Sequence, residues 1–199
     1  MQTSLAAASV VRPPTRARRV TLLALGVCIA ALLAALATVM VHATFSAAIT
    51  PFAPAPADGL IAEGEIVTLA DEHVPAVARL DGALHTALLQ AETDAAAEGL
   101  AFEVTSGWRS PQYQQWLLDD AIQLYASETI ARQYVATPDR SSHVTGDAVD
   151  IVPLDAQLWL IEHGARYGIC QTYANERWHF ELATQPGGVC PQMKEDAAG

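Results

Sequence analysis

Hydrophobic positions change their spacing along the chain, and each spacing predicts a different element. Residues 20–41 form a continuous apolar run, rich in Leu and Ala and without a charge, which is long enough to span a bilayer as a helix. Further along, apolar residues recur at helical spacing over 75–98 and 155–167. Pro111 suits the first position of another helix, because its missing N–H costs nothing there.

Short stretches between these helices have the pattern of strands. Residues 101–106 and 178–182 alternate apolar and polar side chains, whereas 148–152 is a mostly apolar run typical of a buried strand. A further short strand is expected over 169–173. Helix, strand, helix, loop, strand, helix, strand, strand is the resulting order. It predicts an α+β fold in which helices pack on a small antiparallel sheet.

Charge is distributed unevenly around the apolar run. Four of the 11 basic residues precede it and the next Lys or Arg is Arg79. The positive-inside rule therefore predicts a cytoplasmic basic tail over 1–19, a transmembrane anchor over 20–41 and an extracytoplasmic domain. A signal peptide has a shorter apolar core of about 7–15 residues, which favours a retained anchor; cleavage near Ala47 is the alternative. The four arginines are Arg12, Arg16, Arg18 and Arg19.

The rest of the chain reads as a linker, one domain and a tail. Residues 42–59 form a linker rich in Pro and Ala; within it, 50–59 is expected to be extended or, equally, a disordered stalk. Residues 60–193 are enough for one domain with a proper core, and 194–199 form a polar tail expected to fray. All 22 acidic residues follow the apolar run, which argues against nucleic acid and anionic lipid heads as partners. The domain is expected to be a monomer.

Four residues between positions 143 and 179 carry candidate chemistry. His143, Asp150 and His179 are the residue types that hold a catalytic zinc ion with an open position for water, and Glu176 would handle protons. Gly146 lets the chain turn between His143 and the strand that carries Asp150. A lone His-x6-Asp or Glu-x-x-His pair occurs often by chance, so the combination carries the prediction.

Three motifs appear in a characteristic order. Residues 106–110 read Ser-Gly-Trp-Arg-Ser, 141–150 contain Ser-x-His-x-x-Gly-x-Ala-x-Asp, and 176–179 read Glu-x-Trp-His. Together they resemble the signature of the D-alanyl-D-alanine metallocarboxypeptidases of the VanY and VanX type. The resemblance implies a fold similar to the hedgehog signalling domain, a Zn²⁺ cofactor, and removal of the terminal D-Ala from peptidoglycan stem peptides or their precursors.

The resemblance also assigns roles outside the ligand set. Arg109 would stabilise the oxyanion or bind the terminal carboxylate of the substrate; a surface salt bridge is the alternative. Ser141 and Gln114 would either contact the substrate or support the site. Trp178 is expected to pack in the core beside it.

The chain departs from the family pattern at three positions, which leaves substrate preference open. Trp108 stands where Tyr is usual, Arg177 where Pro or Trp is usual, and Glu181 where many members carry Arg. A peptidoglycan endopeptidase of the endolysin kind and an LD-carboxypeptidase are therefore alternatives on the same fold. A zinc-containing binding module without catalysis is a further one, although the presence of Glu176 speaks against it.

Two cysteines lie outside the predicted membrane span. Cys170 and Cys190 would meet an oxidising exterior, where an isolated pair tends to join. We therefore expect a disulfide between them, with two free thiols as the alternative.

Overall fold

The structure is a computed structural model that describes residues 15–47 and 52–199, and the chain divides into two units between Pro51 and Phe52. Most of the predicted basic tail, including Arg12, lies outside the described residues, as does the middle of the predicted linker.

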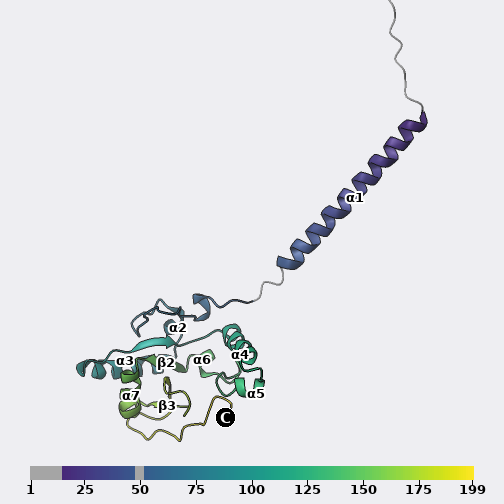
Figure 1. Cartoon of the computed structure of the whole chain (residues 1–199). Helices are drawn as coiled ribbons and strands as arrows, with labels where there is room; N and C mark the ends of the chain where they lie inside the picture. Colours follow the sequence, from purple (N-terminus) through teal and green to yellow (C-terminus); the bar gives the residue numbers. More distant parts are fainter. Residues whose placement is uncertain (1–14, 48–51) are drawn as a thin grey trace, which may run out of the picture. The chain divides into compact units, whose positions relative to one another are not determined.

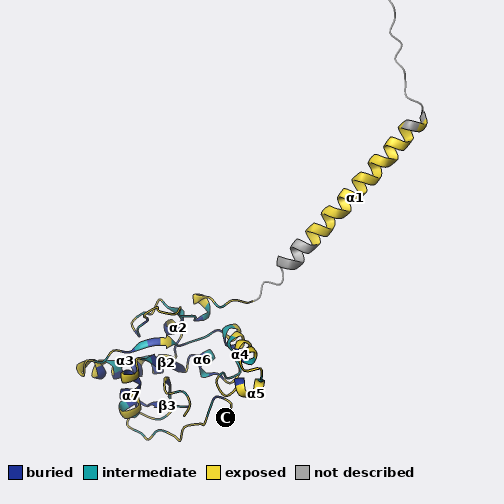
Figure 2. Cartoon of the chain, viewed as in Figure 1, coloured by how far each residue is buried: buried dark blue, intermediate teal, exposed yellow. Residues whose placement is uncertain are grey.

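The first unit contains one long helix, α1, which spans Thr15–Ala47. Its stretch Arg18–Val41 is long and apolar enough to cross a membrane, a property that a signal sequence near the N-terminus shares. Side chains along this stretch are exposed (Figure 2). The last residues of this helix, 42–47, lie within the predicted linker.

The other end of the predicted linker belongs to the second unit. A short 3-10 helix, η1, spans Pro56–Asp58. Asp58 accepts hydrogen bonds from the backbone N–H and the hydroxyl of Ser110, at 2.8 and 3.0 Å. Gly59 follows with φ +93°, and a Cβ there would lie 2.0 Å from the carbonyl oxygen of Trp108. This close approach holds residues 56–59 against the domain, although their composition alone predicts a linker.

The second unit is built on a four-stranded antiparallel sheet with the order β1-β2-β4-β3. Figure 1 labels strands β2 and β3 of this sheet and the helices around it. Together with the helices packed on it, the sheet confirms the predicted α+β fold. The strands are β1 Glu103–Ser106, β2 Ala148–Val152, β3 Ile169–Gln171 and β4 His179–Leu182.

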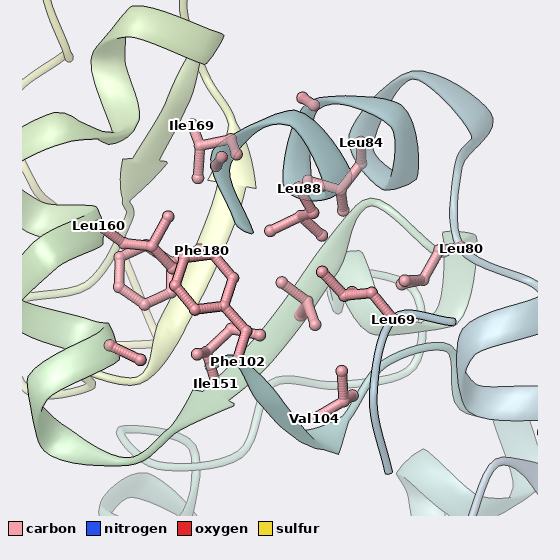
Figure 3. Close-up of a cluster of buried hydrophobic side chains, with 14 of the residues drawn as sticks. Leu69, Leu80, Leu84, Leu88, Phe102, Val104, Ile151, Leu160, Ile169 and Phe180 are labelled. Carbon is pink, nitrogen blue, oxygen red and sulfur yellow. The ribbon is translucent and has the colours of Figure 1, made fainter. Parts of the chain in front are cut away.

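One face of the sheet packs against α3, Gly82–Ala97, and α7, Leu154–His163 (Figure 3). Ile151 of β2 and Phe180 of β4 are fully buried in this core. Because side chains alternate along a strand, the neighbours of these residues point to the opposite face. The core therefore determines that Asp150 and His179 face away from it together.

The predicted helix over 75–98 is two helices. The short helix α2 covers Pro75–Ala78, and α3 begins anew at Gly82. The Asp81 carboxylate accepts hydrogen bonds from the N–H groups of Ala83 and Leu84, which is the contact of an N-cap. The break lets the Asp81 N–H reach the carbonyl of Gly146 at 2.9 Å, so it ties α3 to the turn that follows His143.

A separate pair of helices lies beside the site. The helix α4, Pro111–Tyr125, is capped by Ser110 and packs against α5, Glu128–Ala131. The buried side chains of α4 are Gln114, Leu118 and Ala121.

The C-terminal tail is docked on the domain, so the prediction that 194–199 fray is wrong. Lys194 forms a parallel bridge with Tyr173, Ala197 is buried, and its N–H donates to the carbonyl of Gln133. The predicted disulfide between Cys170 and Cys190 is present. It joins β3 to the segment that leads into the tail.

Candidate metal centre

The three predicted ligands come from two strands and the one-turn helix α6, Ser142–Thr145. Asp150 and His179 are directly paired across β2 and β4, and His143 lies on α6 just before the turn into β2. Gly146 makes that turn with φ +84°. A Cβ there would lie 2.3 Å from the carbonyl oxygen of Arg79, so the turn needs glycine for both conformation and space.

Three donor atoms form a nearly equilateral triangle. His143 Nε2 lies 3.2 Å from His179 Nδ1 and 3.4 Å from Asp150 Oδ1, and the latter two are 3.3 Å apart. Ligands about 2.0–2.1 Å from a tetrahedral zinc ion lie about 3.3 Å from one another. All three side chains are buried, and Asp150 Oδ1 has no hydrogen-bond partner among the described residues. The donor set therefore fits zinc.

Partners on the far side of each ring fix which nitrogen faces the centre. His143 Nδ1 lies 2.8 Å from the carbonyl oxygen of Gly107, which can only accept, so Nδ1 carries the proton and Nε2 is left for a metal. His179 Nε2 lies 2.8 Å from Glu181 Oε1, so Nε2 donates and Nδ1 faces the centre. Gly107 belongs to the upstream motif, which explains why that motif accompanies the ligands.

Burial and neighbouring charges set the protonation of these groups in opposite directions. Burial lowers the pKa of His143 to about 4, which keeps it neutral. Burial also disfavours the imidazolium of His179, but the carboxylates of Asp150 and Glu181 outweigh it and raise its pKa to about 9. For Asp150, the histidines and Arg109 outweigh burial and hold its pKa well below the usual range. Without a bound cation, the proton on His179 thus neutralises Asp150.

Glu176 lies beside the triangle, with Oε2 3.7 Å from His179 Nδ1. The turn before β4 brings the two side chains together, since the His179 N–H donates to the Glu176 carbonyl. Burial raises the pKa of Glu176 to about 7. A carboxyl group whose pKa is near neutrality can both accept and donate a proton at working pH.

Arg109 is held by three partners, one of which is a ligand. Its Nη2 donates to Asp150 Oδ2 at 3.0 Å, its Nη1 to Gln114 Oε1 at 3.1 Å, and its Nε to the Ser106 hydroxyl at 2.8 Å. Gln114 is only 1% exposed and donates its amide to the carbonyl of Ala136. Both polar ends of Gln114 are therefore engaged inside the protein, and it supports Arg109.

A cavity of about 180 Å³ opens onto these groups, and Ser141 contributes to its wall. Trp178 also lines it and is 41% exposed, so the prediction that Trp178 packs in the core is wrong. Strand β4 begins only at His179, so the alternation expected along a strand does not extend to Trp178. Its contact with β2 is made by the backbone, because its carbonyl accepts a hydrogen bond from the Ile151 N–H. The tail residue Ala197 reaches the same wall.

Sequence reasoning assigned no role to Glu181. It appeared only as a departure from the family pattern, yet it makes the closest polar contact of His179. The signal was present, because residues two apart on a strand share a face. The sequence analysis also assigned no role to Tyr173, whose ring centre lies 5.0 Å from that of His179. No local sequence pattern predicts this contact.

A comparison with protein families shows which family the chain belongs to. The family model described as VanY, D-alanyl-D-alanine carboxypeptidase, matches residues 78–185, which is more than half of the chain. The chain belongs to the VanY family. This confirms the family assignment that the three motifs predict, and the matched segment contains all three.

A curated relative resembles almost half of the chain. A D-alanyl-D-alanine carboxypeptidase of Enterococcus faecalis (strain ATCC 700802 / V583) is 30% identical, in an alignment that covers 46% of this chain and 44% of the relative. The chain thus matches less than half the length of that relative.

Solved structures of carboxypeptidases are also similar to this chain. A glutamate-to-alanine variant of the vancomycin resistance D,D-pentapeptidase VanY in complex with Zn(II) is 25% identical, with a TM-score of 0.50, over 62% of this chain and 82% of that one. VanYB in complex with D-alanine-D-alanine is also 25% identical, with a TM-score of 0.50, over 62% and 80%. The LD-carboxypeptidase LdcB, 23% identical with a TM-score of 0.52 over 68% and 72%, shares the fold.

Proposed function

We propose that this chain is a zinc-dependent D,D-carboxypeptidase that removes the terminal D-Ala from peptidoglycan stem peptides or their precursors. The observation that carries the proposal is the triangle of His143, Asp150 and His179 donor atoms with Glu176 beside it. The VanY relatives that were crystallised with Zn(II) and with D-alanine-D-alanine support the metal and the substrate class.

The roles of the residues follow from their contacts. A zinc ion bound by the three ligands would supply a Lewis acid and a water molecule of lowered pKa. Burial raises the pKa of Glu176 to about 7, so near neutral pH its ionised form can take a proton from the attacking water and then pass that proton to the leaving amine. Arg109 keeps Asp150 ionised and orients it through Oδ2, which leaves Oδ1 for the metal.

Arg109 also lines the cavity, where its remaining N–H groups are available to a substrate oxygen. Arginine can bind a carboxylate or a developing oxyanion through more than one N–H. Because Gln114 and Ser106 hold the guanidinium in place, this contact is preorganised. Ser141 is positioned at the wall to contact the peptide.

We further propose that α1 is a retained membrane anchor with the catalytic domain outside the cytoplasm. Its apolar stretch Arg18–Val41 is longer than the core of a cleaved signal peptide. Peptidoglycan lies on that side of the membrane, and the disulfide between Cys170 and Cys190 suits an oxidising exterior.

A second candidate function is cleavage within the stem peptide. A cavity of about 340 Å³ adjoins the first and shares Arg109, Asp150 and Trp178 with it. Substrate residues could thus occupy both sides of the centre, as an endopeptidase requires.

The deciding experiment uses the full chain purified in detergent. It is incubated with peptides that end in D-Ala-D-Ala or D-Ala-D-lactate and with muropeptides, with and without a chelator, and the products are identified by mass spectrometry. Chelator-sensitive release of one D-Ala supports the carboxypeptidase, and internal cleavage supports the endopeptidase. Full activity of metal-free protein in chelator would contradict both.

A further inference from the structure

A short polar contact of the candidate centre, between His179 and Glu181, has no role in the proposed function. Glu181 Oε1 lies 2.8 Å from His179 Nε2, and the two side chains are only 17% and 4% exposed. A carboxylate can only accept, so the ring must donate through Nε2. The contact therefore selects the tautomer whose Nδ1 lone pair is directed at the other two ligands.

The strand geometry makes this contact a consequence of the sequence. His179 and Glu181 are two residues apart on β4 and so share one face of the sheet. Across the neighbouring strands, Glu181 pairs with Ala148 of β2 and Cys170 of β3. Both neighbours are small, so they leave the carboxylate room to turn along its own strand toward the ring.

Polar and charged groups surround Glu181. Besides His179, it interacts with Ser142 and with the charge of Lys194. Lys194 is the single lysine of the sequence. The bridge to Tyr173 positions it, with Nζ 5.3 Å from the centre of the Tyr173 ring. The docked tail thus supplies a cation to the outer side of the centre.

We propose that Glu181 is a positioning residue that fixes the ring of His179 and strengthens its hold on the metal. The inference rests on the proposed zinc site. Carboxylates that accept a hydrogen bond from a metal-ligating histidine orient the ring and raise its basicity, and their loss typically weakens metal binding about 10–100-fold. Glu181 acts only through His179 and needs no contact with substrate.

The test measures zinc dissociation from the loaded full chain, followed as transfer to an excess of a chromophoric chelator. Dissociation starts from the loaded site, so it is independent of proton competition in the metal-free protein. We expect Glu181→Ala to release zinc at least about tenfold faster than wild type. Glu181→Gln keeps an oxygen that can accept from Nε2 and is expected to lie in between. Glu195→Gln, an exposed residue of the same tail, is the matched control and should match wild type.

A second readout is the visible absorption of the cobalt(II)-substituted chain, which reports ligand geometry. Glu181→Ala should alter this spectrum and Glu195→Gln should not. Release within threefold of wild type for both Glu181 variants, with unchanged cobalt spectra, overturns the inference and leaves the zinc site standing. Glu181→Gln alone decides in the same way where Glu181→Ala fails to fold. A wild-type chain that takes up no zinc overturns the proposed function and this inference with it.

Discussion

Asp150 and His179 are direct partners across β2 and β4, and Asp150 Oδ1 lies 3.3 Å from His179 Nδ1. Two ligands of the candidate centre are thereby fixed by backbone pairing. A slip of either strand by one residue would turn its own ligand side chain into the core and away from the other ligand. The core residues Ile151 and Phe180, which are fully buried, therefore act as the restraint on the site.

Glu176 should be required for turnover and dispensable for metal binding. It lies outside the triangle and would move a proton in the transition state, so Glu176→Ala should keep about one zinc per chain and lose about 10²–10⁴-fold in rate. Zinc content by elemental analysis and hydrolysis of a D-Ala-D-Ala peptide are the two measurements. Glu162→Gln, on the exposed side of α7, is the control and should retain both. Full activity of Glu176→Ala would contradict the assignment of Glu176 as the general base.

We expect Gln114 to affect stability and activity through its hydrogen bond with Arg109. Gln114→Ala leaves the Arg109 Nη1 and the Ala136 carbonyl without their partner, which should cost about 1–3 kcal/mol of unfolding free energy. Displacement of Arg109 should also lower kcat/KM, by up to about 100-fold. The neighbouring Gln115 is exposed, so Gln115→Ala is a matched control for thermal and kinetic measurements. Equal effects of the two substitutions would show that Gln114 does not support the site.

Local sequence predicted the candidate ligand set, but not the residues that support it. His143, Asp150, His179 and Glu176 could be placed because a glycine turn and two short strands bring them together with few degrees of freedom. The orientation of Gln114 depends on which face of α4 meets Arg109, and Arg109 in turn depends on Asp150, 41 residues later. Such contacts follow from tertiary packing, which single-sequence patterns do not contain.

Two of the differences between the predicted and the observed elements have the same cause. The helical pattern over 75–98 continues through Asp81. The hydrogen bond from the Asp81 N–H to the Gly146 carbonyl stabilises a break in the helix at this residue. The polar composition of 194–199 suggests a frayed tail, whereas the bridge at Lys194 and the buried Ala197 dock it. In both cases a distant partner outweighed the local preference.

The disulfide should stabilise the domain and hold the tail. The two cysteines are 20 residues apart. Closing a loop of this size lowers the conformational entropy of the unfolded chain, which stabilises the folded state by about 3 kcal/mol. The double variant Cys170→Ala with Cys190→Ala should unfold at a correspondingly lower denaturant concentration. Mass spectrometry of the unreduced exported chain should find the linked peptides. Two alkylatable thiols in fresh exported protein would contradict the bridge.

The proposed anchor predicts one orientation of the chain in the membrane. With Arg16, Arg18 and Arg19 at the start of α1 and no acidic residue in its apolar stretch, the N-terminus should remain in the cytoplasm. A periplasmic-type reporter enzyme fused after Gly199 should be active only outside the cytoplasm, and the fusion should stay with the membrane fraction. Cytoplasmic activity would reverse the topology, and release into the medium would indicate cleavage after α1.

Zinc uptake should release protons at mildly alkaline pH. His179 has a pKa raised to about 9 in the absence of a cation, so at pH 8 its ring is mostly protonated, and Nδ1 must lose that proton to bind a metal. His143 contributes none, because its pKa is lowered to about 4. Since the raised pKa belongs to the metal-free state, zinc affinity should increase as pH rises from 7 toward 9, by about tenfold per pH unit for one proton.

The measurement is zinc titration of the metal-free full chain in weakly buffered solution with a pH indicator, which should register at least one proton per zinc at pH 8. Glu162→Gln controls for titration of surface carboxyls and should match wild type. His179→Ala should bind little zinc and release correspondingly few protons. Zinc affinity that stays flat between pH 7 and 9 would mean that His179 is already neutral, and hence that Asp150 and Glu181 do not hold a proton on its ring.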